Sequence, residues 1–196
     1  MKFSDHVVTS VREVLKNAKS PDLADINSVL RNLTFLYHTM KASEHLLEVA
    51  VECSKCRPEL QASYAEHLEE ERGHHLWLAT DLNSAGVDVL KTGVPVKAVE
   101  MVGSQYYLMH HVDAAALLGY MALMECFSCS LEVVEKLEEA YGKELFRTVR
   151  YHAEHDTDHG ADVADAIDRL PEASKALVLE NAMQAARYFC AATQTF

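Results

Sequence analysis

Residues 27–56, NSVLRNLTFLYHTMKASEHLLEVAVECSKC, contain the clearest structural pattern in the chain. Their apolar side chains recur mostly at steps of three and four residues, which places them on one face of an α-helix. The members of this apolar set are Leu30, Leu33, Leu36, Tyr37, Met40, Leu47 and Val51. No segment of the chain alternates apolar and polar residues for long enough to indicate a strand. The pattern therefore predicts a long helix in an all-α protein.

The same spacing recurs on both sides of this segment, between breaks made by proline and glycine. Ser4 is the expected N-cap of the first helix, and Asp113 is the expected cap of the fifth. Six further helices are expected, over residues 4–19, 58–86, 95–111, 113–142, 143–170 and 171–192. Seven helices predict one helical bundle, a single domain over residues 1–196.

The composition favours a globular protein of 196 residues, because 49% of the residues are apolar and 24% are charged. The formal net charge of −12 disfavours nucleic acids and anionic membranes as partners. No apolar stretch approaches the roughly 20 residues of a membrane span. The N-terminal segment MKFSDHVVTSVREVL lacks the apolar region of a signal peptide. Together with five widely spaced cysteines, which we interpret as reduced thiols, these features predict a cytoplasmic protein.

The segment YHAEHDTDH, residues 151–159, contains the first candidate metal ligands. His152, Asp156 and His159 stand at i, i+4 and i+7, so on a helix their side chains form one stripe over two turns. Histidine and carboxylate are common metal ligands, and three of them on one stripe can point inward together. A solvated polar face is the alternative interpretation of the same segment.

The segment EHLEEERGHH, residues 66–75, repeats the theme on the expected third helix. Glu71 and His74 make an E-x-x-H motif, with both side chains on one helix face. His67 and Glu70 lie on the same face and are alternative ligands. The motif is short and common, so it indicates a metal site only in combination with other ligands.

Glu125 is the only charged residue in LLGYMALMECF, residues 117–127. A carboxylate in such a segment is expected to be buried, and an isolated buried charge is very costly. It must therefore meet a proton, a metal ion or a cationic side chain from a neighbouring helix. A structural ion pair with Arg or Lys is the alternative to metal binding.

The combined pattern matches bundles that bind two metal ions with carboxylates and histidines from several helices. The predicted metal ligands are Glu71, His74, Glu125, His152, Asp156 and His159. Three carboxylates and three histidines suit two iron or manganese ions better than zinc. The second helix offers only Glu44, His38 and His45, of which His45 is a weak further candidate and otherwise a core or substrate-facing histidine, like His38.

These residues resemble those of the haem-oxygenase-like di-iron oxidases and oxygenases, over roughly residues 27–170. The likeness rests on the His-x3-Asp-x2-His pattern at 152–159, on Glu125 and on HLEEERGH at 67–74. The segments EHLEEERGHHLWLATDLNSAG and SQYYLMHHVDAAALLGYMALME also look like the iron-containing redox proteins of that group. The resemblance implies a haem-oxygenase-like bundle, which the thiaminase-like and PQQ-synthase-like proteins share.

The resemblance also implies a function, a non-haem di-iron oxidoreductase with two iron ions per chain and manganese as the alternative metal. Its partners would be O2 and a small organic substrate of amine, amino acid or fatty acid type. It implies the six ligands named above, with Glu70 or His67 as alternatives to Glu71. The ligands do not identify the substrate, and a homodimer and a monomer both stay open.

Other interpretations stay open at this stage. One is a cofactorless or haem-binding enzyme of the same bundle, with His38 or His45 as the haem ligand. Another is a thiaminase-like enzyme with Cys126 or Cys129 as nucleophile. The third is a non-enzymatic helical interaction protein or a ferritin-like metal store. The spacings Cys53-x-x-Cys56 and Cys126-x-x-Cys129 also occur in zinc sites, although both pairs are expected within helices.

Overall fold

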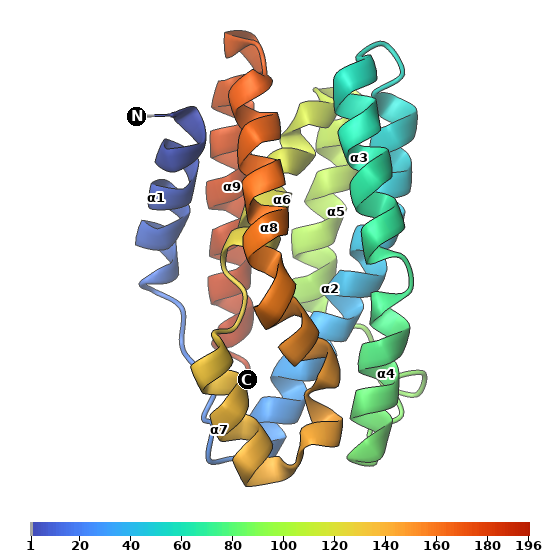
Figure 1. Ribbon diagram of the computed structural model, residues 1–196, viewed down its shortest axis with the longest axis vertical. Coiled ribbons are helices and arrows are strands. Elements are labelled where there is room, and N and C mark those ends of the chain that lie inside the picture. The colour runs from blue at the N-terminus through green and yellow to red at the C-terminus, as the bar shows by residue number, and fades with distance from the viewer. Residues whose placement is uncertain (1) are drawn as a thin grey trace.

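The computed structural model describes residues 2–196, apart from the side chains of residues 156–158, and this part is helical with no strand (Figure 1). Its α-helices are α1 (Phe3–Leu15), α2 (Ile26–Cys53), α3 (Pro58–Glu71), α4 (His74–Ser84), α5 (Val96–His111), α6 (Leu117–Cys126), α7 (Leu131–Tyr141), α8 (Arg147–Arg169) and α9 (Glu172–Thr193). Two short 3-10 helices, η1 (Ala114–Ala116) and η2 (Lys143–Leu145), precede α6 and α8. The all-α prediction is confirmed, with nine α-helices in the described part instead of seven.

Two of the expected helices are interrupted, and the prediction of continuous helices was wrong at both places. The helix expected over 58–86 is divided into α3 and α4, because Gly73 adopts a left-handed φ of 82° that ends a right-handed helix. The helix expected over 113–142 is divided at residues 127–130, which separate α6 from α7. The first interruption has a direct effect on the site, since Glu71 ends α3 and His74 begins α4.

The first helix also differs from the prediction in its cap and its end. It stops at Leu15, and Ser4 lies within α1 instead of capping it. The backbone N–H and the hydroxyl of Ser4 both donate to the Asp168 carboxylate, at 2.9 and 2.8 Å. Ser4 therefore joins α1 to α8. The Asp113 cap is confirmed, since its carboxylate accepts from Ala115 N in η1.

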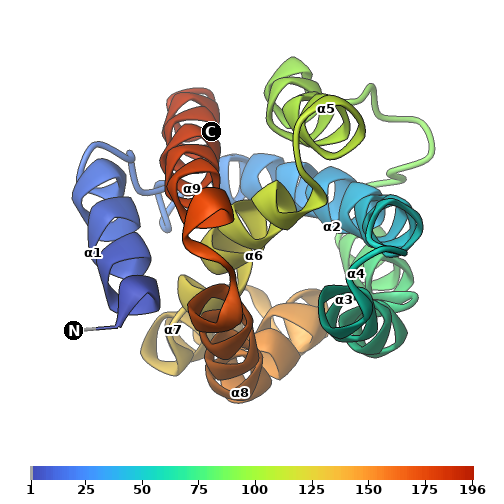
Figure 2. The same cartoon turned by 90° about the horizontal axis from the view of Figure 1, so that it is seen from above.

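Helix α6 occupies the middle of the bundle (Figure 2). Every residue from 117 to 123 is buried, as expected for a helix that is apolar on all sides. It packs against α8 and α9. A Cβ placed on Gly119 would stand only 2.3 Å from the carbonyl oxygen of Val178, so α6 and α9 touch backbone to backbone. This close crossing fixes the position of the helix that carries Glu125.

The buried apolar residues form two clusters, and α2 contributes to both. The larger cluster joins α1, α5, α6 and α9, together with parts of α3 and α8. The smaller one joins α4 and α7 with the start of α8. No single described helix is both long and apolar enough for a membrane span; the bent pair Ala114–Cys126 and Leu131–Tyr141, at 59° to each other, meets the length and composition criteria together.

Candidate metal centre

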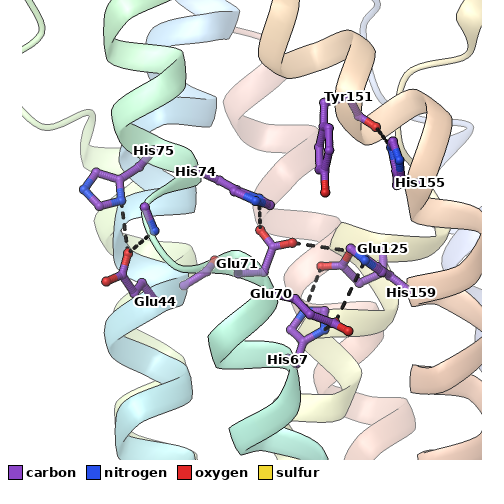
Figure 3. Close-up of polar contacts among 12 residues, drawn as sticks. Glu44, His67, Glu70, Glu71, His74, His75, Glu125, Tyr151, His155 and His159 are labelled. Carbon is purple, nitrogen blue, oxygen red and sulfur yellow. Dashed lines mark hydrogen bonds and ion pairs between the residues drawn. The ribbon is translucent and has the colours of Figure 1, made fainter.

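Six histidine and glutamate side chains from four helices meet between α3, α4, α6 and α8, and Figure 3 labels all of them except His152. We call them the metal cluster. Its members are His67 and Glu71 of α3, His74 of α4, Glu125 of α6, and His152 and His159 of α8. The side chain of Glu125 is only 10% exposed, and that of His74 only 4%. The interior of the bundle thus holds at least two carboxylates beside four imidazoles.

Glu71 belongs to two groups of potential ligands at once. One group is Glu71, His74 and His152, and the other is His67, Glu71 and Glu125. In each group one donor atom from every residue lies within 4.8 Å of the others. The two carboxylate oxygens of Glu71 point to different histidines. Oε2 accepts from His74 Nδ1 at 3.1 Å, and Oε1 lies 3.7 Å from His159 Nδ1 (Figure 3). A carboxylate in this position is placed to bridge two ions.

Glu125 has a histidine beside each of its oxygens. Its Oε1 lies 3.3 Å from His67 Nε2, and its Oε2 lies 3.7 Å from His159 Nδ1. The two imidazole rings are edge to face, with centroids 5.7 Å apart. The charge on α6 therefore meets histidines, not the structural Arg or Lys partner that was the alternative.

Protons occupy part of this cluster when no metal is bound. Burial alone would raise the pKa of Glu125, but the imidazoles of His159 and His67 beside its two oxygens lower it to about 2. The adjacent carboxylate of Glu125 in turn raises the pKa of His159 to about 9. Metal-bound histidines must be neutral, so a cation that binds here takes the place of these protons.

The donor atoms fit a metal pair. Within the described residues, Glu71 Oε1 and His159 Nδ1 are buried and have no hydrogen-bond partner. Buried polar atoms are nearly always satisfied, so atoms left over at one point indicate a missing ligand. A mixed set of imidazole nitrogens and carboxylate oxygens suits iron or manganese.

The structure brings together five of the six predicted ligands: Glu71, His74, Glu125, His152 and His159. The side chain of the sixth, Asp156, lies outside the described residues, so its role stays a prediction. His67 appeared in the sequence only as an alternative to Glu71, yet both residues lie in the cluster. Their i, i+4 spacing on one helix face was the signal that allowed both.

The second helix contributes no member to the described cluster. Glu44 of α2 accepts from the backbone N–H of Gly73 at 3.1 Å and lies 3.2 Å from His75 Nδ1 (Figure 3). It thereby holds the break between α3 and α4 in place. His45 is 60% exposed and pairs with Glu48, so its interpretation as a ligand, core or substrate-facing histidine was wrong.

A buried aspartate of α4 anchors the other side of the centre. Asp81 is 1% exposed and accepts from the backbone N–H and hydroxyl of Thr148, at 2.8 and 2.7 Å, and from Arg147 Nε at 3.0 Å. Its carboxylate thus caps the N-terminus of α8, where the helix dipole favours negative charge. One turn further along α8, His152 packs against His74, with ring centroids 5.1 Å apart.

Comparisons with known proteins concern the family and the fold of the chain. Residues 33–193 match a family described as iron-containing redox enzymes. A domain of unknown function with a heme oxygenase-like fold, from Shewanella denitrificans OS217, is similar with a TM-score of 0.74 and 17% identity, covering 98% of this chain and 86% of that chain. A CadD-like protein of unknown function from Nostoc punctiforme PCC 73102 is similar with a TM-score of 0.65 and 15% identity, covering 98% and 97%.

No curated protein matches the chain. At identities this low the two structures show the fold alone. The expected haem-oxygenase-like bundle is confirmed by them.

Proposed function

The chain belongs to the family of iron-containing redox enzymes, and from this premise we propose that it is a non-haem di-iron oxidase or oxygenase acting on a small organic substrate. One observation carries the proposal. Glu71 belongs to two ligand groups, and within each group one donor atom per residue lies within 4.8 Å of the others. A carboxylate shared by two groups is what a bridge between two ions requires.

We assign one ion to Glu71, His74 and His152, and the other to His67, Glu71 and Glu125, with His159 beside the second group. Asp156 remains a predicted ligand from its position on the stripe of α8. Iron bound here would supply the activation of O2. The chain itself supplies the acids and imidazoles that replace the water ligands of the metal, and walls that keep solvent away from them.

The thiaminase-like alternative loses support at its proposed nucleophiles. Burial raises the pKa of Cys126 to about 11 and also raises that of Cys129. A nucleophilic cysteine needs the opposite shift, because the thiolate is the reactive form. Neither thiol therefore has the environment of a catalytic nucleophile.

The experiment is an anaerobic Fe(II) titration, followed by measurement of O2 consumption. We expect about two irons per chain, as in di-iron carboxylate bundles, and O2 uptake that depends on iron. His159→Ala should lose at least one iron while the helical circular dichroism stays nearly intact. His111→Ala is the matched control, because His111 is exposed on α5 and should leave iron binding unchanged. A His159→Ala protein with full iron occupancy, or a wild-type protein that binds no iron, would overturn the proposal.

A further inference from the structure

The outward side of α5 carries a stripe of exposed, mostly apolar residues. Helix α5 lies at the edge of the bundle, and its inner side packs on α2 and α9 (Figure 2). The stripe consists of Val96, Val99, Gly103, Tyr107 and His110, which are all exposed. On a helix these residues lie within about 40° of the direction of Gly103. They therefore form one continuous line along α5, which the rest of the described chain leaves uncovered.

Exposed apolar residues are concentrated on and just before this stripe. Five of the ten large apolar residues that the described chain exposes are Leu90, Val94, Val96, Val99 and Tyr107, which are 55 to 83% exposed. Together they expose roughly 600 Å² of surface, at the upper end of the ~300–600 Å² of the largest apolar patch on a typical monomer. Each partner in a standard protein interface buries ~800 Å². The stripe and its apolar neighbours therefore supply most of the area that a stable interface needs.

The same face is free of unpaired charge. Helix α5 is described in full, and its exposed residues include no lysine, arginine, aspartate or glutamate. Its two charged side chains, Lys97 and Glu100, are half-buried and pair with each other at 2.7 Å. A strongly charged partner, such as a nucleic acid or a basic peptide, would meet no opposite charge here. A second copy of this chain avoids that mismatch, because two uncharged faces then meet.

The stripe is also symmetrical about Gly103. Val99 and Tyr107 stand four residues to either side of it, and Val96 and His110 stand seven residues to either side. A twofold axis brings the same patch of two copies together. If two α5 helices lie antiparallel with the axis at Gly103, Val99 of each copy faces Tyr107 of the other, and Val96 faces His110. A small residue on the axis lets the two helices pack closely.

We propose that the chain forms a twofold homodimer in which the α5 helices of two copies pack antiparallel across Gly103. The partner is a second copy because one stripe supplies both halves of the interface in register. Tyr107 and Val99 form the centre of the interface, where an aromatic ring contributes most to binding. The metal cluster has no member on α5, so the dimer is independent of the function proposed above.

Gly103→Cys tests the register of the two helices. A Cβ at this position meets nothing within 4 Å in a single chain, so the variant should fold. On the twofold axis the two new thiols face each other within reach of a disulfide. Under mild oxidation with diamide, most of the Gly103→Cys protein should become a covalent dimer on a non-reducing gel. Glu135→Cys, at an exposed position of α7 on the far side of the bundle, and the wild type with its five free cysteines should not (Figure 2).

Two matched variants test whether the stripe holds the dimer together. Val99→Glu places a carboxylate against Tyr107 of the second copy twice in each dimer, and should raise the dimer dissociation constant at least about 100-fold. Val112→Glu makes the same change at a valine that is 57% exposed but lies off the stripe, and should leave the constant unchanged. Sedimentation velocity over a concentration series measures the constant, and circular dichroism verifies folding.

The outcomes decide both the dimer and the surface that forms it. A wild-type protein that keeps the monomer mass of 21.9 kDa would overturn the homodimer, provided that the series reaches about 100 μM. A dimer that survives Val99→Glu, or one in which Gly103→Cys forms no disulfide, would overturn the assignment to α5. A folded, monomeric Val99→Glu protein beside a cross-linked Gly103→Cys dimer would support both, whatever amount of iron the protein binds.

Discussion

Two regions of the bundle bury polar atoms, and they differ in how those atoms are satisfied. Where α9 crosses α5, Asn181 Nδ2 donates to Gln105 Oε1 at 2.7 Å and to Ala116 O at 2.6 Å, and Gln105 Nε2 donates back to Asn181 Oδ1 at 3.2 Å. In the metal cluster, Glu71 Oε1 and His159 Nδ1 have no hydrogen-bond partner among the described residues. The first region is complete as it stands, whereas the second leaves donor atoms for the metal ions proposed above.

Helix α6 takes part in both regions and shows how the fold separates them. Gly119 faces α9, and Glu125, six residues later, points about 120° away around the helix to the metal cluster. The close backbone contact on one side fixes the helix, and the carboxylate on the other side is available for a ligand. We therefore expect substitutions at α9 to change stability, and substitutions in the metal cluster to change iron binding.

The largest effect is expected at the closed region, for Gly119→Ala. The new Cβ would meet Val178 O at 2.3 Å and Ala182 N at 2.7 Å, so α6 and α9 must separate. The free energy of unfolding should fall by about 3 kcal/mol or more, measured by denaturant unfolding. Gly103→Ala on α5 is the control, because its Cβ meets nothing within 4 Å and alanine favours a helix. Equal destabilisation of the two variants would contradict the close crossing.

Glu71→Ala tests the open region and should have the next largest effect. Both ligand groups lose their common member, so iron affinity should fall by at least about 100-fold, and both ions should be affected. The unfolding free energy of the metal-free protein should fall by only about 1–2 kcal/mol, the cost of losing the hydrogen bond between Glu71 Oε2 and His74 Nδ1. Glu66→Ala, an exposed glutamate of the same helix, should bind iron like the wild type. Retention of one iron at full affinity would exclude a bridging role.

Asn181→Leu should have the opposite effects to Glu71→Ala, because it should lower stability and leave iron binding unchanged. It leaves the buried Gln105 amide and Ala116 O without their partner, so the unfolding free energy should fall by about 2 kcal/mol, while iron stoichiometry stays unchanged. Adding Gln105→Leu should cost less in the double variant than it does alone, because the two amides act as one unit. Asn83→Leu, at an exposed position of α4, is the control. A loss of iron in a folded Asn181→Leu protein would remove the distinction between the regions.

The smallest effect concerns pH at the start of α6. Burial alone would raise the pKa of Asp113, but hydrogen bonds from Arg57, Ala115 N and Ser174 and the charge of Arg57 lower it. Its contribution to stability is therefore present above the ordinary aspartate pKa of about 4 and is lost as the pH falls through the lowered value.

Asp113→Asn should remove this contribution. In acid, the unfolding free energy of the Asp113→Asn protein should depend less on pH than that of the wild type. Denaturant unfolding below about pH 4 measures the difference. Identical pH profiles would show that Asp113 has the same pKa in the folded and unfolded chains.

The helical periodicity of the sequence was sufficient to predict the all-α fold, but not the break at Gly73. Gly103 and Gly160 lie within helices, whereas Gly73 adopts a left-handed conformation. The neighbours of Gly73 along the chain do not distinguish these cases. The difference lies in Glu44, which accepts the Gly73 N–H from another helix. A contact between residues far apart in the sequence decides the break, so local propensity cannot predict it.

The candidate site was predictable to a similar extent. Residue types and spacing on α8 indicated His152 and His159, and the isolated charge in an apolar segment indicated Glu125. The pairing of His67 with Glu125, at 3.3 Å, depends on how α3 and α6 lie against each other. That packing is set by the whole bundle, and the sequence pattern of either helix alone does not contain it.

The break between α3 and α4 has a consequence for comparing this chain with its homologues. Glu71 and His74 stand on opposite sides of two non-helical residues, so no helical turn locks the interval between them. Insertion or deletion at this joint would leave both helices whole and the acid and imidazole still converging. The interval of three positions from the glutamate to the histidine is therefore free to change without loss of either helix. A search profile for this site is best written with a variable gap between the two residues.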